Sequence, residues 1–230
     1  MTKKKIGYIV DSFSPYLQKN IDLPDNVRYL PLTIYIDGKS YKDGIDIQVE
    51  DVFEKIVPGN GFKTSQPSPK LLIDLYNELS PKYEDVIYFP VGSAISGTYQ
   101  TAVSFSREYK NIHVINNTFV GREFKSIIDE LNSIDADFAI ANRYINKMQK
   151  NTNTYVVPKN NLALIKGGRI NGFKSLVLKV LKSFPVISFK DKVELKNVGI
   201  KRKNASAIKF AIKKQIKFIE QSEFDLNDFV

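Results

Sequence analysis

The sequence contains no cysteine, only one histidine and no long apolar run. Without cysteine the chain forms no disulfide, thiolate metal site or cysteine nucleophile, a composition typical of a reducing compartment. With His113 as the single histidine, a zinc site built from several histidines is disfavoured, and we expect no metal. The apolar run from Ile6 to Val10 is too short for a secretion signal, and no stretch approaches the length that spans a bilayer. We therefore expect a cytoplasmic protein.

The composition is that of an ordinary globular protein. The 230 residues are 43% hydrophobic and 26% charged, which argues against disorder and against a membrane bundle. A chain of this length allows one large domain or two small ones.

Strand and helix patterns alternate through the first two thirds of the chain. Short apolar runs predict strands at Lys5–Val10, Val27–Ile36, Val86–Val91 and Ile112–Ile115. Helical spacing predicts helices between them, and the Asp37-Gly38 turn predicts a hairpin. This alternation favours an α/β fold with a largely parallel sheet over residues 1–150. Residues 151–230 are predicted to form a smaller α/β domain with helices near Leu162, Ser175 and Ala205.

Positive charge is concentrated near the C-terminus. The segment from Lys174 to Lys217 holds twelve lysines and one arginine against two acidic residues, whereas the chain as a whole carries +9. Such a skew favours an anionic partner, although a solvated lysine-rich surface explains it equally well.

The densest cluster of small polar residues is Gly92-Ser93-Ala94-Ile95-Ser96-Gly97-Thr98, between a predicted strand and a predicted helix. Hydroxyls and helix N-terminal amides at such a junction suit an anion. A simple helix N-cap at Ser96 is the structural alternative. A serine hydrolase is a third reading, but the cluster lacks the G-x-S-x-G pattern and His113 would have to serve as its base.

Several motifs together resemble the DegV family of fatty acid-binding proteins. In chain order, they are Asp11-Ser12, Gly38 to Gly44, Lys63-Thr64-Ser65-Gln66-Pro67-Ser68, Ser93 to Gln100, Gly167-Gly168-Arg169-Ile170 and Arg202. The threonine-serine-glutamine-proline loop followed by the serine-glycine-threonine-tyrosine turn is the most specific combination.

The resemblance implies a two-domain α/β protein that holds one fatty acid in an apolar tunnel, with its carboxylate bound by hydroxyl groups. It implies no other cofactor and no catalysis by the chain itself. The protein would present the fatty acid to a separate fatty acid kinase, which forms an acyl phosphate for phospholipid synthesis. By this resemblance the ligand-binding residues are Thr64, Ser65, Ser93, Ser96, Gly97 and Thr98.

Two arginines are implied to dock the partner. Arg202 corresponds to a family position near the mouth of the pocket, and Arg169 follows a pair of glycines. The Gly167-Gly168-Arg169 segment could equally cap the C-terminus of a helix.

The chain also departs from the family pattern. Asn116-Asn117 stand where aspartate-serine is usual, and Gly92 stands where a second serine is common. The sequence ends at Val230 without the family's histidine-threonine-glycine-proline-glycine segment, so we expect either an incomplete second domain or a natural short form.

Two other function classes remain open from the residues alone. A nucleic-acid-binding module would use the basic segment, but that segment lacks a known motif and aromatic stacking platforms, so no nucleic acid is expected. The serine hydrolase is the weaker alternative. A transient contact with a membrane surface fits the basic, amphipathic last helix.

Overall fold

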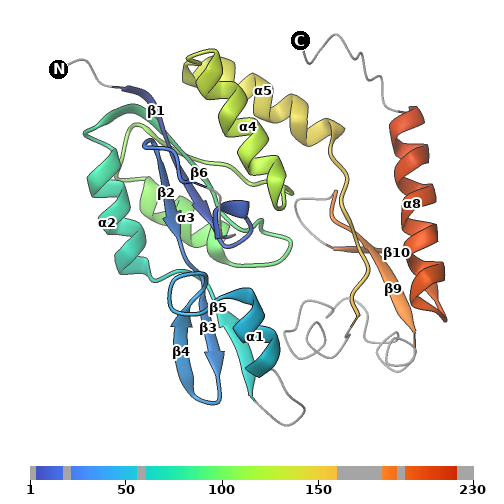
Figure 1. The fold of residues 1–230 in the computed structure, drawn as a ribbon. Coiled ribbons are helices and arrows are strands. Elements are labelled where there is room, and N and C mark those ends of the chain that lie inside the picture. The colour runs from blue at the N-terminus through green and yellow to red at the C-terminus, as the bar shows by residue number, and fades with distance from the viewer. Residues whose placement is uncertain (1–3, 18–21, 56–60, 160–182, 191–194, 222–230) are drawn as a thin grey trace. The chain divides into compact units, whose positions relative to one another are not determined.

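The computed structural model describes residues 4–17, 22–55, 61–159, 183–190 and 195–221 (Figure 1). The chain divides into two compact units, Met1–Asn146 and Lys147–Val230. Both units combine helices with β-sheet, so the chain has the mixed α/β fold that the alternating patterns predict. Arg169 and the helices expected near Leu162 and Ser175 lie outside the described residues.

A four-stranded parallel sheet forms the centre of the first unit. Its order is β2-β1-β6-β7, and every neighbouring pair runs parallel. The central strands are apolar on both faces: Ile9 and Tyr88 are buried on one, and Tyr8 and Phe89 on the other. The strands are β1 (Lys4–Asp11), β2 (Val27–Leu30), β6 (Tyr83–Phe89) and β7 (Ile112–Val114).

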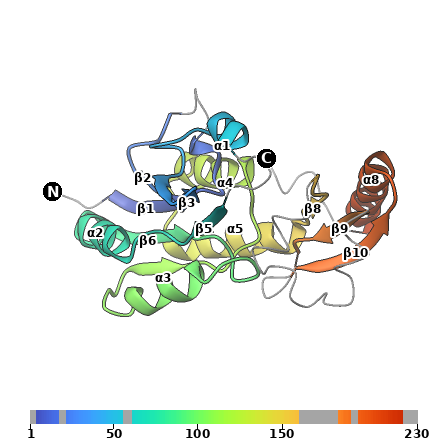
Figure 2. The ribbon, with the colours of Figure 1, turned by 90° about the horizontal axis from the view of Figure 1, so that it is seen from below.

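Helices cover both faces of this sheet. Helix α2 (Pro69–Leu79) and helix α3 (Thr98–Ser106) share one buried cluster with Ile9 and Tyr88. Pro69 suits the first turn of α2, where its missing N–H would have no partner anyway. In Figure 2, α3 lies below the strands and α4 above them.

Helix α4 (Arg122–Ser133) closes the other face with aromatic contacts. The Phe124 ring meets the Phe89 ring edge-on, with centroids 5.9 Å apart, and Phe89 stacks on Tyr8. Helix α5 (Phe138–Asn151) follows, and the short 3-10 helix η1 (Pro15–Leu17) comes directly after β1.

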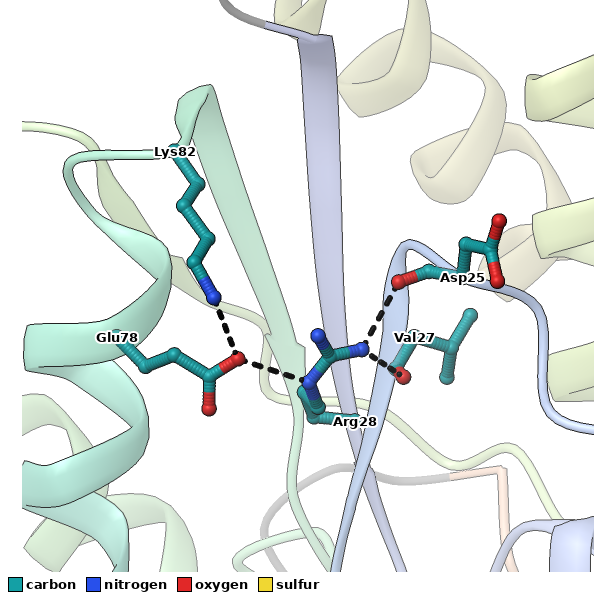
Figure 3. Close-up of polar contacts among 5 residues, drawn as sticks. All are labelled: Asp25, Val27, Arg28, Glu78 and Lys82. Carbon is teal, nitrogen blue, oxygen red and sulfur yellow. Dashed lines mark hydrogen bonds and ion pairs between the residues drawn. The ribbon is translucent and has the colours of Figure 1, made fainter.

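An ion-paired cluster joins strand β2 to helix α2 (Figure 3). Arg28 Nε donates to Glu78 Oε1 at 3.1 Å, and Lys82 Nζ donates to the same oxygen at 2.9 Å. Arg28 Nη1 also donates to the carbonyl oxygens of Asp25 and Val27. The guanidinium therefore connects the edge strand to the helix that covers it.

Tyr83, at the start of β6, lies against the backbone of β1. A Cβ atom built at Gly7 would sit 2.6 Å from the Tyr83 ring, which is too close for any side chain. The Tyr83 ring is buried and packs against Gly7 of β1.

A second, antiparallel sheet of order β4-β3-β5 carries the predicted hairpin. Asp37 and Gly38 both have positive φ, as the tight turn between two paired strands requires. Val27–Ile36, predicted as one strand, is divided at Pro31-Leu32 into β2 and β3, which belong to different sheets. The elements are β3 (Thr33–Ile36), β4 (Lys39–Lys42), α1 (Val49–Lys55) and β5 (Phe62–Ser65).

The second unit contains an antiparallel sheet of order β10-β9-β8 and a long helix. Ala207 of this helix is buried, whereas its isoleucines at 208, 212, 216 and 219 are each between 44% and 54% exposed. The elements are β8 (Tyr155–Val156), β9 (Phe184–Ser188), β10 (Lys196–Lys201) and α8 (Asn204–Gln221).

Candidate functional site

Three loops leave the parallel sheet at the carboxyl ends of β1, β6 and β7. This edge is where ligands bind in open α/β sheets. The loops carry most of the polar residues that the sequence analysis singled out, and hydrogen bonds connect the loops to one another.

Ser93 and Asn116 join the loop after β6 to the loop after β7. The Ser93 backbone N–H donates to Asn116 Oδ1 at 3.1 Å, and Asn116 Nδ2 donates to Ser93 Oγ at 2.9 Å. The two hydrogen bonds with Asn116 therefore fix the position of Ser93 at the start of this loop.

Gly92 allows these two loops to approach closely. A Cβ atom at Gly92 would lie 2.2 Å from the backbone oxygen of Asn117. Asn117 is itself held by its side chain, which donates to the Pro90 and Ile115 carbonyls and accepts from the Phe119 N–H. Glycine at position 92, one of the departures from the family pattern, thus has a steric reason here.

Ser96, Gly97 and Thr98 form the start of helix α3. The helix begins at Thr98 with Gly97 as its N-cap residue, so the cap is not Ser96. Ser96 Oγ nevertheless accepts the Thr98 N–H at 3.2 Å and lies 2.7 Å from Thr98 Oγ1. Both hydroxyls are thus placed at the N-terminal end of the helix, where backbone amides favour negative charge.

Thr64 and Ser65 end strand β5, and the next residue ties this segment to helix α3. Thr64 is exposed and Ser65 is half-buried. Gln66 Oε1 accepts a hydrogen bond from Thr101 Oγ1 at 3.0 Å. A Cβ atom at Gly97 would lie 3.7 Å from the same oxygen, so the loop after β5 runs beside the start of α3.

A buried acidic group underlies the loops. Asp11, the last residue of β1, is fully buried, and burial raises the pKa of its carboxyl to about 7. Burial also raises the pKa of Asp43, while a hydrogen bond from Ser12 opposes that rise. Ser12 Oγ lies 2.9 Å from the Tyr29 hydroxyl and accepts the Leu32 N–H at 3.0 Å.

His113 lies in a different arrangement, on the edge strand β7. Its Nε2 is 2.7 Å from Asp85 Oδ1, and its ring stacks on Phe138 with centroids 3.5 Å apart. Ser93 Oγ accepts a hydrogen bond from Asn116, whereas His113 bonds to Asp85. The described geometry therefore does not assemble the serine–histidine pair that a hydrolase would need.

Arg202 is exposed in the bend between β10 and α8. Arg169, the other docking candidate, lies outside the described residues.

The described part of the chain contains no group of three or more histidine or acidic residues that could hold a metal ion. None of its helices is long and apolar enough to cross a membrane.

A separate hollow of about 270 Å³ lies at the opposite edge of the sheet, toward the amino ends of the strands. Its lining includes Lys5, Asn26, Asn132 and Asp135. These residues bond mainly to one another, since Asn26 pairs with Asn132 and Lys5 pairs with Asp135. The hollow is not part of the hydroxyl cluster.

The sequence analysis missed the residues that hold the cluster in place. Asn116 was noted only as a departure from the family, and Gln66 and Asp11 were noted only as parts of motifs. An acidic residue at the end of an otherwise apolar strand was the available signal for Asp11.

Comparison with known proteins identifies the family. The model of the DegV family, which is described as uncharacterised, matches residues 5–225. A DegV domain-containing protein from Staphylococcus aureus is 30% identical over 229 residues, covering 97% of this chain and 80% of the relative. One from Mycoplasmopsis pulmonis is 30% identical over 194 residues, covering 81% of this chain. The matched region spans 66% of that longer relative.

Solved structures share the fold. A fatty acid binding DegV family protein from Streptococcus agalactiae superposes with a TM-score of 0.83 at 22% identity, covering 95% of this chain and 80% of that one. The Streptococcus pneumoniae Fatty Acid Kinase B3 protein, loaded with linoleic acid, gives a TM-score of 0.74 at 20% identity. The match covers 93% of this chain and 78% of that one. At these identities the structures establish the fold, and the family model and the curated relatives establish that the chain belongs to the DegV family.

Proposed function

We propose that the protein binds a long-chain fatty acid and presents it to a fatty acid kinase without itself catalysing a reaction. In this proposal Thr64 and Ser93 donate to the carboxylate, and Ser65, Ser96, Gly97 and Thr98 complete the polar surroundings. The first 150 residues would bind the head group, and residues 151–230 would cover the acyl chain. A cysteine-free chain fits presentation in the cytoplasm.

The observation that carries the proposal is the hydroxyl cluster at the carboxyl edge of the sheet. Ser93 exchanges hydrogen bonds with the neutral Asn116 amide, and Ser96 bonds to the hydroxyl and backbone N–H of Thr98. Neutral donors satisfy a buried carboxylate without a permanent counter-charge, so the ligand can leave again. Burial of the acyl chain adds about 0.8 kcal/mol per CH₂, so the tail would dominate affinity.

Two observations support the finer parts of the proposal. A structural neighbour is a Fatty Acid Kinase B3 protein, which suggests a kinase as the partner and acyl phosphate as its product. The exposed isoleucines and lysines of α8 suit a transient contact with an anionic membrane surface. Arg202, together with Arg169, would dock the kinase.

Mass spectrometry of an organic extract of the purified protein tests the proposal, followed by calorimetry with oleic acid. Ser93→Ala and Thr64→Val should each weaken binding by about 1–3 kcal/mol, the cost of leaving an oxygen of the bound carboxylate unpaired. Ser126→Ala, on the exposed side of α4, is the matched control and should bind as the wild type does.

Unchanged affinity in the Ser93/Thr64 double variant would refute the assigned carboxylate contacts. Absence of any fatty acid, combined with nucleic-acid binding that weakens steeply with salt, would favour the alternative based on the basic segment.

A further inference from the structure

The Asp11 carboxylate bridges the loops after β1 and β6. Its Oδ1 accepts the Phe13 N–H at 3.1 Å, within its own loop. Its Oδ2 accepts the Val91 N–H at 2.5 Å, across to the loop that follows β6. Val91 is two residues before Ser93, so the second bond holds the turn that carries Ser93.

Burial of the Asp11 carboxylate is energetically costly, and no positively charged side chain among the described residues offsets that cost. The charged and titratable groups that face it are Asp43 from the loop after β4, Tyr29 on β2 and Tyr88 on β6. Of these, the Asp43 carboxylate opposes ionisation of Asp11, whereas the two tyrosines stay neutral because burial raises their pKa values. None of the described residues forms an ion pair with Asp11. The backbone N–H groups of Phe13 and Val91 offset part of the cost of burying the carboxylate. A charged acceptor bonds such groups about twice as strongly as a neutral one.

The turn after β6 is also fixed from its other side. Asn117 packs against Gly92, and Asn116 exchanges two hydrogen bonds with Ser93. Asp11 supplies a further attachment, at Val91. The position of the Ser93 hydroxyl therefore depends on side chains from the ends of two other strands, β1 and β7.

We propose that Asp11 is a positioning residue, which holds the Val91–Ser93 turn so that the Ser93 hydroxyl is oriented for carboxylate binding. The inference rests on the proposed function, because it assumes that Ser93 contacts the ligand's carboxylate. Asp11 itself does not touch the ligand in this arrangement.

Measuring the oleic acid affinity of the Asp11→Asn variant distinguishes two roles of Asp11, holding the turn and repelling the ligand's carboxylate. The substitution keeps the size of the side chain but replaces one acceptor oxygen with a donor, so one of the two amides loses its partner. If Asp11 positions the turn, the affinity falls at least tenfold. If Asp11 acted only as a negative charge near the carboxylate, its removal would tighten binding, so tighter or unchanged binding overturns the proposal.

Glu123→Gln is the matched control. Glu123 is also a largely buried carboxylate with a raised pKa, and its Oε2 accepts a backbone N–H, that of Val120, at 2.7 Å. It lies at the start of α4 and not at the hydroxyl cluster. The control variant should keep wild-type affinity even if its melting temperature falls, and an equal loss of affinity would assign the Asp11 effect to general stability.

Nuclear magnetic resonance of the wild-type protein gives a second, independent readout. The Val91 amide signal should titrate with a midpoint near pH 7, moving downfield as Asp11 ionises and its hydrogen bond strengthens. Asp11→Asn should abolish that titration. A Val91 amide in the wild type that is both pH-independent and without the downfield shift of a hydrogen bond to a carboxylate would overturn the proposal even if the variant does not fold. Failure of the wild type to bind oleic acid would instead refute the proposed function, while the amide titration would still show whether Asp11 holds the turn.

Discussion

Gly92 occupies a position that no side chain can fill without moving the next loop. A Cβ atom at this position would lie 2.2 Å from the Asn117 backbone oxygen. The three hydrogen bonds of the Asn117 side chain oppose any shift of that residue. Gly92→Ala should therefore lower the free energy of unfolding by about 1–3 kcal/mol, as measured by urea denaturation. Gly97→Ala is the control, since its Cβ would be in ordinary contact, 3.7 Å from Gln66 Oε1. Similar losses in both variants would contradict the steric account.

The candidate site was only partly predictable at the scale of single residues. Ser93, Ser96 and Thr98 stand in one short segment, so the sequence alone places them at a strand–helix junction. Asn116 and Asp11 reach the same turn from other strands, and only the order of the sheet brings them there. Contacts between such distant residues are invisible to a reading of local spacing.

The cluster of Arg28, Glu78 and Lys82 makes a prediction at the scale of elements. The hydrogen bond from Lys82, followed by that from Arg28, lowers the pKa of Glu78. A lowered pKa means that the stabilisation is present above the unfolded value of 4.5 and is lost as the pH falls through the folded value. Because Glu78 is about one third exposed, Glu78→Gln should cost only about 0.5–1 kcal/mol at pH 7, and almost nothing at pH 3.

Denaturation of wild type and variant at both pH values measures this difference. Asp74→Asn on the same helix is the control, because its pair with Lys70 is far more exposed and should contribute nothing measurable. A loss from Glu78→Gln that is equal at pH 3 and pH 7 would show that packing, not charge, explains it.

Most elements follow the apolar periodicity, and the failures have identifiable causes. β1 and β6 each contain a short apolar run that is buried on both faces of the sheet, so the sequence predicts these two strands well. Val27–Ile36 was wrong as a single strand, because Pro31 lacks an N–H and the chain changes sheets there. Periodicity indicates that a residue is in a strand, but not which sheet the strand joins.

At the scale of the whole molecule, the proposed encounter with a kinase depends on exposed charge. Arg202→Glu should leave oleic acid affinity unchanged, since the residue is exposed in the bend before α8, but should slow acyl phosphate formation about tenfold in a kinase-coupled assay. Lys39→Glu on β4 is a control of equal charge change. Equal rates for the two variants at low and at high ionic strength would exclude an electrostatic docking role for Arg202.

The boundary between the two compact units lies inside a helix. The change in pattern after Asn151 places a boundary near residue 150, whereas the compact units divide between Asn146 and Lys147, within helix α5. A continuous helix carries no compositional sign of a boundary, because its apolar stripe continues across it.

The contact between Gly7 and Tyr83 also has an evolutionary consequence. The Tyr83 ring fills the space that any side chain at position 7 would need. A mutation that adds a side chain at position 7 is tolerable only in a lineage that has first replaced Tyr83 with a smaller residue, and that replacement alone leaves a void in the core. The order in which these two substitutions can be fixed is therefore constrained, and we expect descendants of this sequence to keep glycine and tyrosine together or to change both.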